Sequence, residues 1–75
     1  MAVKDAVAER VSAICAERRI RVNELANISG ITPSTVYSLL DVRRRDVSIV
    51  TIKKLCDGLD MTLAEFFSAP DFDAL

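Results

Sequence analysis

A break in the chain at residues 29–33 limits the possible folds more than any other feature of the sequence. The segment reads Ser-Gly-Ile-Thr-Pro and separates two short stretches with apolar residues at helical spacing, residues 22–28 and 33–40. Gly30 can adopt a positive φ after a helix without steric cost. Thr32 offers an N-cap hydroxyl, and Pro33 suits a first helical turn because its missing N–H has no partner there. The sequence therefore predicts two short helices joined by a tight turn.

Three more helices are expected, and all helices should pack in one core. Residues 4–18 form an amphipathic helix whose apolar face carries Val3, Val7, Val11, Ile14 and Cys15. Residues 48–58 form another, capped by Ser48, with core positions at Ile49, Ile52, Leu55 and Cys56. A capping-box pattern from Thr62 to Glu65 opens a short fifth helix that ends at Phe66 and Phe67. The charged segment 41–47 is expected to be a loop, and the tail 68–75 to be irregular.

The pair of helices at residues 22–40 fits a helix-turn-helix. In that motif two helices cross steeply, so the backbones approach closely at the turn. Ala26 supplies the small residue that this approach needs, and Val36 and Leu39 face back toward the first helix. An ordinary αα-hairpin in a small bundle is the alternative. A strand over residues 36–39 is disfavoured by the Thr-Pro start.

The composition argues against an enzyme. The 75 residues are 51% hydrophobic, enough for one small all-α domain, which we assign to residues 1–68 with residues 69–75 as a C-terminal tail. The chain has no histidine, so the usual general base and the commonest metal ligand are missing. Cys15 and Cys56 are far apart and form no CxxC motif, so they are expected to be buried free thiols. We expect no catalytic residue, no metal, no cofactor and no small-molecule substrate.

The charge is unevenly distributed along the chain. The net charge is −1, but all ten Lys and Arg residues fall within residues 1–54, together with six of the eleven acids. Residues 55–75 carry the other five acids. This asymmetry indicates one basic face and one acidic end. No apolar stretch has the length of a membrane span and the first residues do not resemble a signal peptide, so a cytoplasmic protein without a membrane partner is expected.

The helix-turn-helix segment resembles a known family. Residues 22–40, Val-Asn-Glu-Leu-Ala-Asn-Ile-Ser-Gly-Ile-Thr-Pro-Ser-Thr-Val-Tyr-Ser-Leu-Leu, are similar to the motif of lambda-repressor-like regulators, also called the xenobiotic-response-element family. Residues 48–67 resemble the fourth and fifth helices of that family, so the likeness covers about residues 5–67. It implies a compact five-helix DNA-binding domain and a bacterial or phage transcriptional regulator, most simply a repressor. The helix 33–40 would lie in the major groove.

The resemblance also implies which residues contact DNA. The N-terminal residues of the recognition helix reach base edges in this motif. The base-contacting candidates are Pro33, Ser34, Tyr37 and Ser38. The phosphate-contacting candidates are Arg21, Asn23, Thr32, Thr35, Arg43, Arg44 and Arg45. Leu40 and Val42 replace the usual Glu and Gly after the recognition helix, which leaves extra apolar surface.

Two partner assignments remain open at this point. One helix-turn-helix unit contacts few bases, so a homodimer on double-stranded DNA is expected. A protein-interaction module of the same fold, antitoxin-like or antirepressor-binding and with little DNA affinity, is the alternative. One of Phe66 and Phe67, together with Phe72 and Leu75 of the tail, is expected to form an apolar patch for self-association; alternatively, the tail folds back over the first helix and closes the core.

Overall fold

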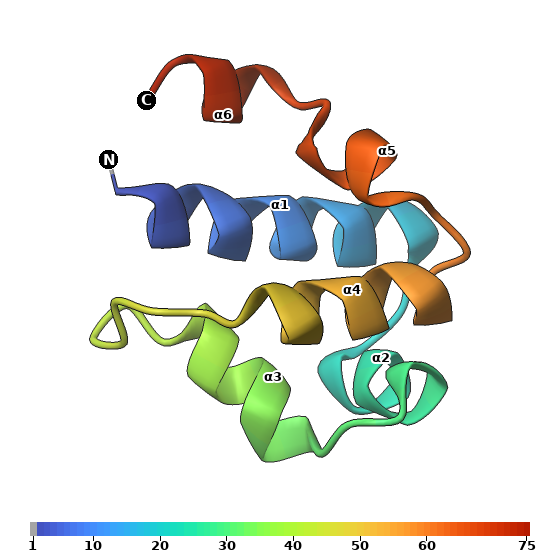
Figure 1. Cartoon of the computed structure of the whole chain (residues 1–75). Coiled ribbons are helices and arrows are strands. Elements are labelled where there is room, and N and C mark those ends of the chain that lie inside the picture. Colours follow the sequence, from blue (N-terminus) through green and yellow to red (C-terminus); the bar gives the residue numbers. More distant parts are fainter. Residues whose placement is uncertain (1) are drawn as a thin grey trace.

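The computed structural model describes residues 2–75 and contains only helices within that range. In chain order they are α1 (Val3–Arg18), α2 (Val22–Ser29), α3 (Pro33–Leu40), α4 (Ile49–Gly58), α5 (Leu63–Phe67) and α6 (Pro70–Asp73). In Figure 1, α1 and α4 cross the middle of the molecule, with α2 and α3 on one side and α5 and α6 on the other. Helix α2 packs against both α3 and α4, while α6 packs against α1. The all-helical prediction is confirmed, with six helices rather than five.

One hydrophobic core joins these helices. Its fully buried members come from α1 to α5 and from the residue after α4: Val7, Val11, Ile14, Leu25, Ala26, Val36, Leu39, Ile52, Leu55, Cys56, Leu59 and Phe66. Two residues expected in the core are outside it, because Val3 and Ile49 are 60% and 57% exposed. Each is the first residue of its helix, where no neighbouring helix covers it. Both cysteines are free thiols; Cys56 is buried and Cys15 is half-buried.

Helix ends follow the predicted capping chemistry. The side chains of Thr32, Ser48 and Thr62 each accept a hydrogen bond from a backbone N–H in the first turn of the next helix, and Thr62 forms a capping box with Glu65. Gly30 ends α2 with φ of 68°. Asp60 follows α4 with φ of 55°, as its tolerance of left-handed backbone allows. These caps fix where the turns fall, and they place α3 directly after the tight turn.

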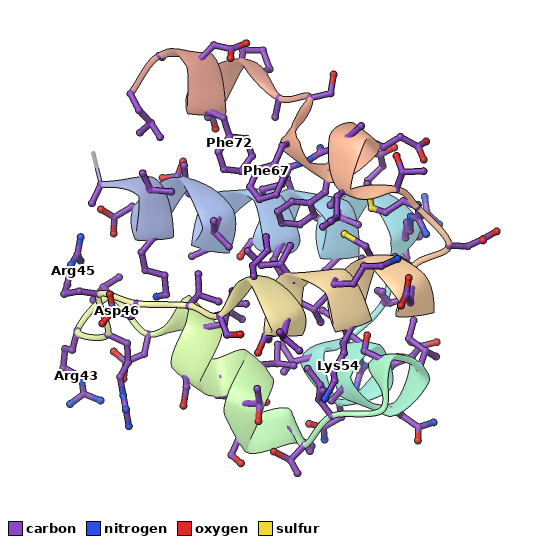
Figure 2. All side chains as sticks on the ribbon, in the orientation of Figure 1. Arg43, Arg45, Asp46, Lys54, Phe67 and Phe72 are labelled. Carbon is purple, nitrogen blue, oxygen red and sulfur yellow. The ribbon has the colours of Figure 1, made fainter. Side chains whose placement is uncertain are left out.

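The prediction of an irregular C-terminal tail is wrong. Pro70 begins the one-turn helix α6, where its fixed φ is already suitable. Phe72 then packs with its ring centroid 4.9 Å from that of Phe67 and 6.2 Å from that of Phe66. The burial of this ring against the core stabilises a turn that sequence composition alone does not favour. Figure 2 shows Phe67 and Phe72 next to each other over α1. Phe72 therefore packs on the core, whereas Leu75 of the same tail stays 51% exposed.

Three basic side chains of α1 bind the C-terminal ends of other helices. The Lys4 ammonium donates to the carbonyl of Asp41, which ends α3, over 3.1 Å. Arg10 donates to the carbonyls of Phe66 and Glu65 in α5, over 2.7 and 2.9 Å. Arg18 donates to the carbonyl of Leu59, which ends α4. A cation at a helix C-terminus satisfies carbonyls that lack an intrahelical partner and complements the helix dipole.

Helices α2 and α4 approach each other closely at Gly58. A Cβ atom at this position would lie 2.5 Å from the Ser29 Oγ atom and 2.8 Å from the carbonyl oxygen of Ile28. Ser29 Oγ is buried and has no hydrogen-bond partner among residues 2–75. The absence of a side chain at Gly58 thus sets the separation of α2 from α4. Because α2 also packs on α3, Gly58 helps to fix the helix-turn-helix on the rest of the domain.

Candidate nucleic-acid interface

Helix α3 turns a polar face to solvent. Val36 and Leu39 are buried against the core, as predicted. Pro33, Ser34 and Tyr37 are exposed, and Ser38 is half-buried beside them. Tyr37 is a large aromatic side chain, yet it is 56% exposed. The four residues predicted to contact bases therefore lie together on one outward face of α3.

Hydroxyl groups gather at the N-terminus of α3. Thr32 Oγ1 accepts a hydrogen bond from the Thr35 backbone N–H over 3.3 Å and lies 2.9 Å from Thr35 Oγ1. It also lies 3.1 Å from Ser34 Oγ. These hydroxyls are donors and acceptors that can rotate, so they can exchange their mutual contacts for contacts with a ligand. The helix N-terminus behind them favours negative charge.

A hollow of about 170 Å³ lies between α3, the following loop and the start of α4. Its lining consists of Thr35, Ser38, Leu39, Arg44, Asp46, Val47, Ser48 and Thr51. The hydroxyls, the guanidinium of Arg44 and the N-terminal end of α4 favour an anion there. The carboxylate of Asp46 is the opposing group. The hollow directly adjoins the exposed face of α3, because Ser38 belongs to both.

The three consecutive arginines have different surroundings. Arg43 is fixed by Asp41: Nε lies 3.1 Å from Oδ1, and Nη2 lies 2.9 Å from Oδ2. This pairing lowers the pKa of the Asp41 carboxyl to about 2. Arg45 instead reaches α1, where its Nη2 atom lies 3.0 Å from Asp5 Oδ2. Hydrogen bonds from Arg45 and from the Ala2 backbone N–H lower the pKa of Asp5.

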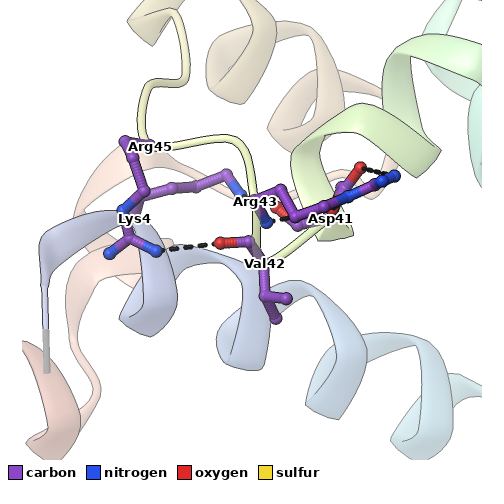
Figure 3. A network of polar contacts seen from close by, with 5 residues as sticks. All are labelled: Lys4, Asp41, Val42, Arg43 and Arg45. Carbon is purple, nitrogen blue, oxygen red and sulfur yellow. Dashed lines mark hydrogen bonds and ion pairs between the residues drawn. The ribbon is translucent and has the colours of Figure 1, made fainter.

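Arg44 is the member of the run without such a partner. Within the described part of the chain it has neither a salt bridge nor a side-chain hydrogen bond, and it lines the hollow beside α3. Figure 3 shows the contrasting placement of Arg43 beside Asp41 and of Arg45 beside the carbonyl of Val42. The sequence grouped the three arginines as equal phosphate contacts, whereas their geometry separates them.

The remaining phosphate candidates lie at the start of α2. Arg21 is the N-cap residue of α2, makes no side-chain capping bond and is exposed. Asn23 is exposed in the first turn. Both side chains can reach a ligand at this helix N-terminus, which is a second position that favours negative charge.

Sequence reasoning missed Lys4, Asp5 and Gly58. A signal for Lys4 was present: the buried stripe of α1 runs through Lys4, Val7, Val11 and Ile14 at spacings of three and four, and Lys4 is only 4% exposed. The prediction placed Val3 on that stripe instead. The contact of Asp5 with Arg45 joins residues 40 positions apart and has no local signature.

Comparisons with known proteins agree with this arrangement. Residues 10–71 match the family model of the Cro/C1-type HTH DNA-binding domain, and the chain belongs to this family. Its structure is similar to the crystal structure of the prophage Lp1 protein 11, with a TM-score of 0.86, 25% sequence identity and coverage of 100% of both chains. No curated protein matches the sequence. The predicted lambda-repressor-like helix-turn-helix fold is confirmed, and membership of this family supports a DNA-binding regulator.

Two further observations concern membranes and metal ions. No helix in residues 2–75 is long and apolar enough to cross a membrane. The same residues contain no cluster of three or more His, Cys, Asp or Glu side chains placed to hold a metal ion.

Proposed function

We propose that this protein is a sequence-specific repressor that binds double-stranded DNA as a homodimer in the cytoplasm and acts by binding rather than by catalysis. The observation that carries the proposal is the exposed polar face of α3, formed by Pro33, Ser34, Tyr37 and Ser38. In a helix-turn-helix this face enters the major groove. Ser hydroxyls can bond to several base edges, and Tyr37 can donate its OH or pack on a thymine methyl.

Phosphate contacts on both sides of α3 would set the depth of the helix in the groove. On one side, Arg21 and Asn23 stand at the N-terminus of α2. On the other side, Thr35, Arg44 and Ser48 line the hollow at the N-terminus of α4. Phosphate contacts position a protein on the duplex without reading its sequence.

A dimer is proposed because a single unit of this size reads too few base pairs to select one site. Two units on a pseudo-palindrome would place their α3 helices about 34–36 Å apart, one helical turn of B-DNA. Sedimentation of the protein with duplexes of varied half-site spacing tests this arrangement. Two chains per duplex at spacings of about 10–10.5 base pairs is the expected result. One chain per duplex at every spacing would contradict the dimer.

Selection of bound sequences from a random duplex pool tests the function itself. We expect one enriched motif, and Ser34→Ala, Tyr37→Ala and Ser38→Ala should each cost about 1–3 kcal/mol at the motif position where a base contact is lost. Ser12→Ala on the exposed side of α1 is the matched control. If no motif is enriched and duplex binding shows no salt dependence, the chain is instead a protein-interaction module of this fold. In vitro transcription from a promoter that contains the motif then separates a repressor from an activator.

A further inference from the structure

We propose that the first turn of α1 is a clamp that positions the arginine loop, and that Arg45 is held by this clamp instead of contacting DNA. The arginine loop is defined as residues 41–45, and the clamp residues are Lys4 and Asp5. The proposal rests on the proposed DNA-binding function, because it assigns roles within the same surface. It replaces three equivalent phosphate contacts by one, Arg44, because Arg43 is paired with Asp41 and Arg45 with Asp5.

Lys4 holds the start of the loop. Its ammonium donates to the carbonyl oxygen of Asp41 over 3.1 Å, and its side chain is almost fully buried. The same carbonyl accepts the Arg44 backbone N–H over 3.0 Å, which closes a tight turn. Removing the carbonyl from this position would leave a buried ammonium unpaired, which is costly. Lys4 therefore fixes both the end of α3 and the turn that follows it.

Asp5 holds the end of the loop. Its two carboxylate oxygens accept from the Arg45 guanidinium at 3.0 and 3.4 Å, and Arg45 also donates to the Val42 carbonyl over 3.0 Å. The Ala2 backbone N–H donates to Asp5 over 3.0 Å and orients the carboxylate. The pair is about half exposed, so it adds little to the stability of the fold. Its effect is on where the loop lies.

Adjacent residues of α1 thus hold the two ends of a five-residue segment, one with a cation and one with an anion. Figure 3 shows Lys4, Val42 and Arg45 at this crossing of α1 and the loop. The remaining free cation of the segment, Arg44, is directed to the hollow that also contains Thr35 and Ser38 of α3. A loop that is already ordered loses less conformational entropy when it binds, so the clamp favours contact by Arg44.

Salt-dependent binding to the selected duplex separates the arginines. Each phosphate contact contributes about 0.9 to the slope of log K against log salt concentration. Arg44→Gln should reduce the slope by about this amount. Arg45→Gln should weaken binding about two- to ten-fold with the slope unchanged, because only loop order is lost. A slope that falls by about one unit in Arg45→Gln would show a direct phosphate contact and overturn the proposal.

Asp5→Asn tests the other half of the pair, with Glu9→Gln as the matched control one turn along α1. Both variants remove one negative charge, but Glu9 has no bond to the loop. We expect Asp5→Asn to bind about two- to ten-fold more weakly than Glu9→Gln. Tighter binding by Asp5→Asn than by Glu9→Gln would mean that Asp5 competes with phosphate for Arg45, and would overturn the clamp.

The exchanged pair, Asp5→Arg with Arg45→Asp, tests whether binding depends on the bridge between positions 5 and 45 or on a positive charge at position 45. The double variant should bind better than Arg45→Asp alone, because the bridge to α1 is re-formed. If Arg45 itself contacted phosphate, an aspartate at that position would repel DNA whatever stood at position 5. A double variant that binds no better than Arg45→Asp alone would therefore overturn the proposal.

Amide hydrogen exchange of the free protein measures the clamp without DNA. The Arg44 N–H, which donates to the Asp41 carbonyl, should exchange faster in Asp5→Asn and in Lys4→Met than in Glu9→Gln. Thermal melting of each variant controls for loss of the fold. If this amide responds as expected but the wild-type protein binds no duplex, the DNA-binding function fails and the clamp stands. If the amide does not respond while the protein binds DNA, the clamp alone fails.

Discussion

Arg10, on one side of the α1–α4 layer, has the opposite role to Arg21 and Arg44 on the other side. On the side of α5 and α6, Arg10 binds the carbonyl end of α5 and lies 5.9 Å from the centroid of the Phe66 ring. On the side of α2 and α3, Arg21 and Arg44 are exposed next to helix N-termini. The difference is the polarity of the helix end that each cation faces. A C-terminus binds the cation inside the molecule, whereas an N-terminus leaves it available to an anion. The role of a basic residue therefore follows from its neighbours and not from the number of basic residues nearby.

The largest effect is expected on the side of α5 and α6, the aromatic side, where the rings of Phe66, Phe67 and Phe72 pack together. Phe72→Ala should lower the free energy of unfolding by about 2–3 kcal/mol, because a half-buried ring is removed from contact with Phe66 and Phe67. Urea denaturation measures the change, and Leu75→Ala, at a 51% exposed position, is the control. Duplex binding by the folded protein should be unchanged. A loss of affinity without a loss of stability would give the aromatic side a direct role in binding.

A substitution at Gly58 should affect both stability and binding. Gly58→Ala places a Cβ within 2.8 Å of the Ile28 carbonyl oxygen, so α2 must move away from α4. We expect a loss of about 1–2 kcal/mol of stability, since the steric cost exceeds the better helix propensity of alanine. Affinity for duplex DNA should fall as well, because α2 carries α3 with it. Calorimetry and fluorescence anisotropy measure the two effects; unchanged affinity would mean that α3 keeps its place independently of α2.

An effect on stability of similar size, but without the loss of DNA affinity, is expected at the inward-facing cation. Arg10→Gln removes two charge-assisted hydrogen bonds to the end of α5 and should cost about 1–2 kcal/mol of stability. Arg21→Gln is the matched control, and as a surface change it should alter stability by less than about 0.5 kcal/mol. DNA affinity should instead fall more in Arg21→Gln than in Arg10→Gln. Equal stability losses in the two variants would break the distinction between the two sides.

The smallest effect is electrostatic and lies in the loop. The folded-state pKa of Asp41 is about 2, below its ordinary value of 3.8, because Arg43 binds the carboxylate. The stabilising contribution is thus present above about pH 4 and is lost as the pH falls toward 2. An NMR titration of the Asp41 carboxyl should give this midpoint. In Arg43→Gln the pKa of Asp41 should rise only part of the way back to 3.8, because the backbone N–H of residue 43 still donates to the carboxylate. No movement would assign the shift to other groups.

Local signals in the sequence predicted the helix ends and the turn correctly. Thr32, Ser48 and Thr62 act within one helical turn, so their residue types were enough to locate the caps. Helix α6 was missed because the packing of Phe72 on the core stabilises it, whereas the helix propensity of its four residues is too weak to predict a helix.

The candidate interface was predicted less completely than the fold. The outward face of α3 followed from helical periodicity once Val36 and Leu39 were placed inward. The unequal surroundings of Arg43, Arg44 and Arg45 depend on Asp41 and on Asp5, and the second of these lies on another helix. No pattern in the run of three arginines distinguishes them. Contacts between segments far apart in the chain are the part that sequence reasoning could not reach.

The separation of charge between the ends of the chain has a consequence for the kinetics of association. Residues 55–75 hold five acids and no base, and α5 and α6 within them lie across the α1–α4 layer from α3 (Figure 1). A molecule with such a charge distribution experiences a torque in the field of a polyanion. Under the proposed DNA-binding function, this torque turns α5 and α6 away from the duplex during diffusional approach, so that the opposite side, which carries α3, faces it. Although its net charge is −1, the protein can therefore enter productive encounters with DNA faster than an unoriented body of the same charge.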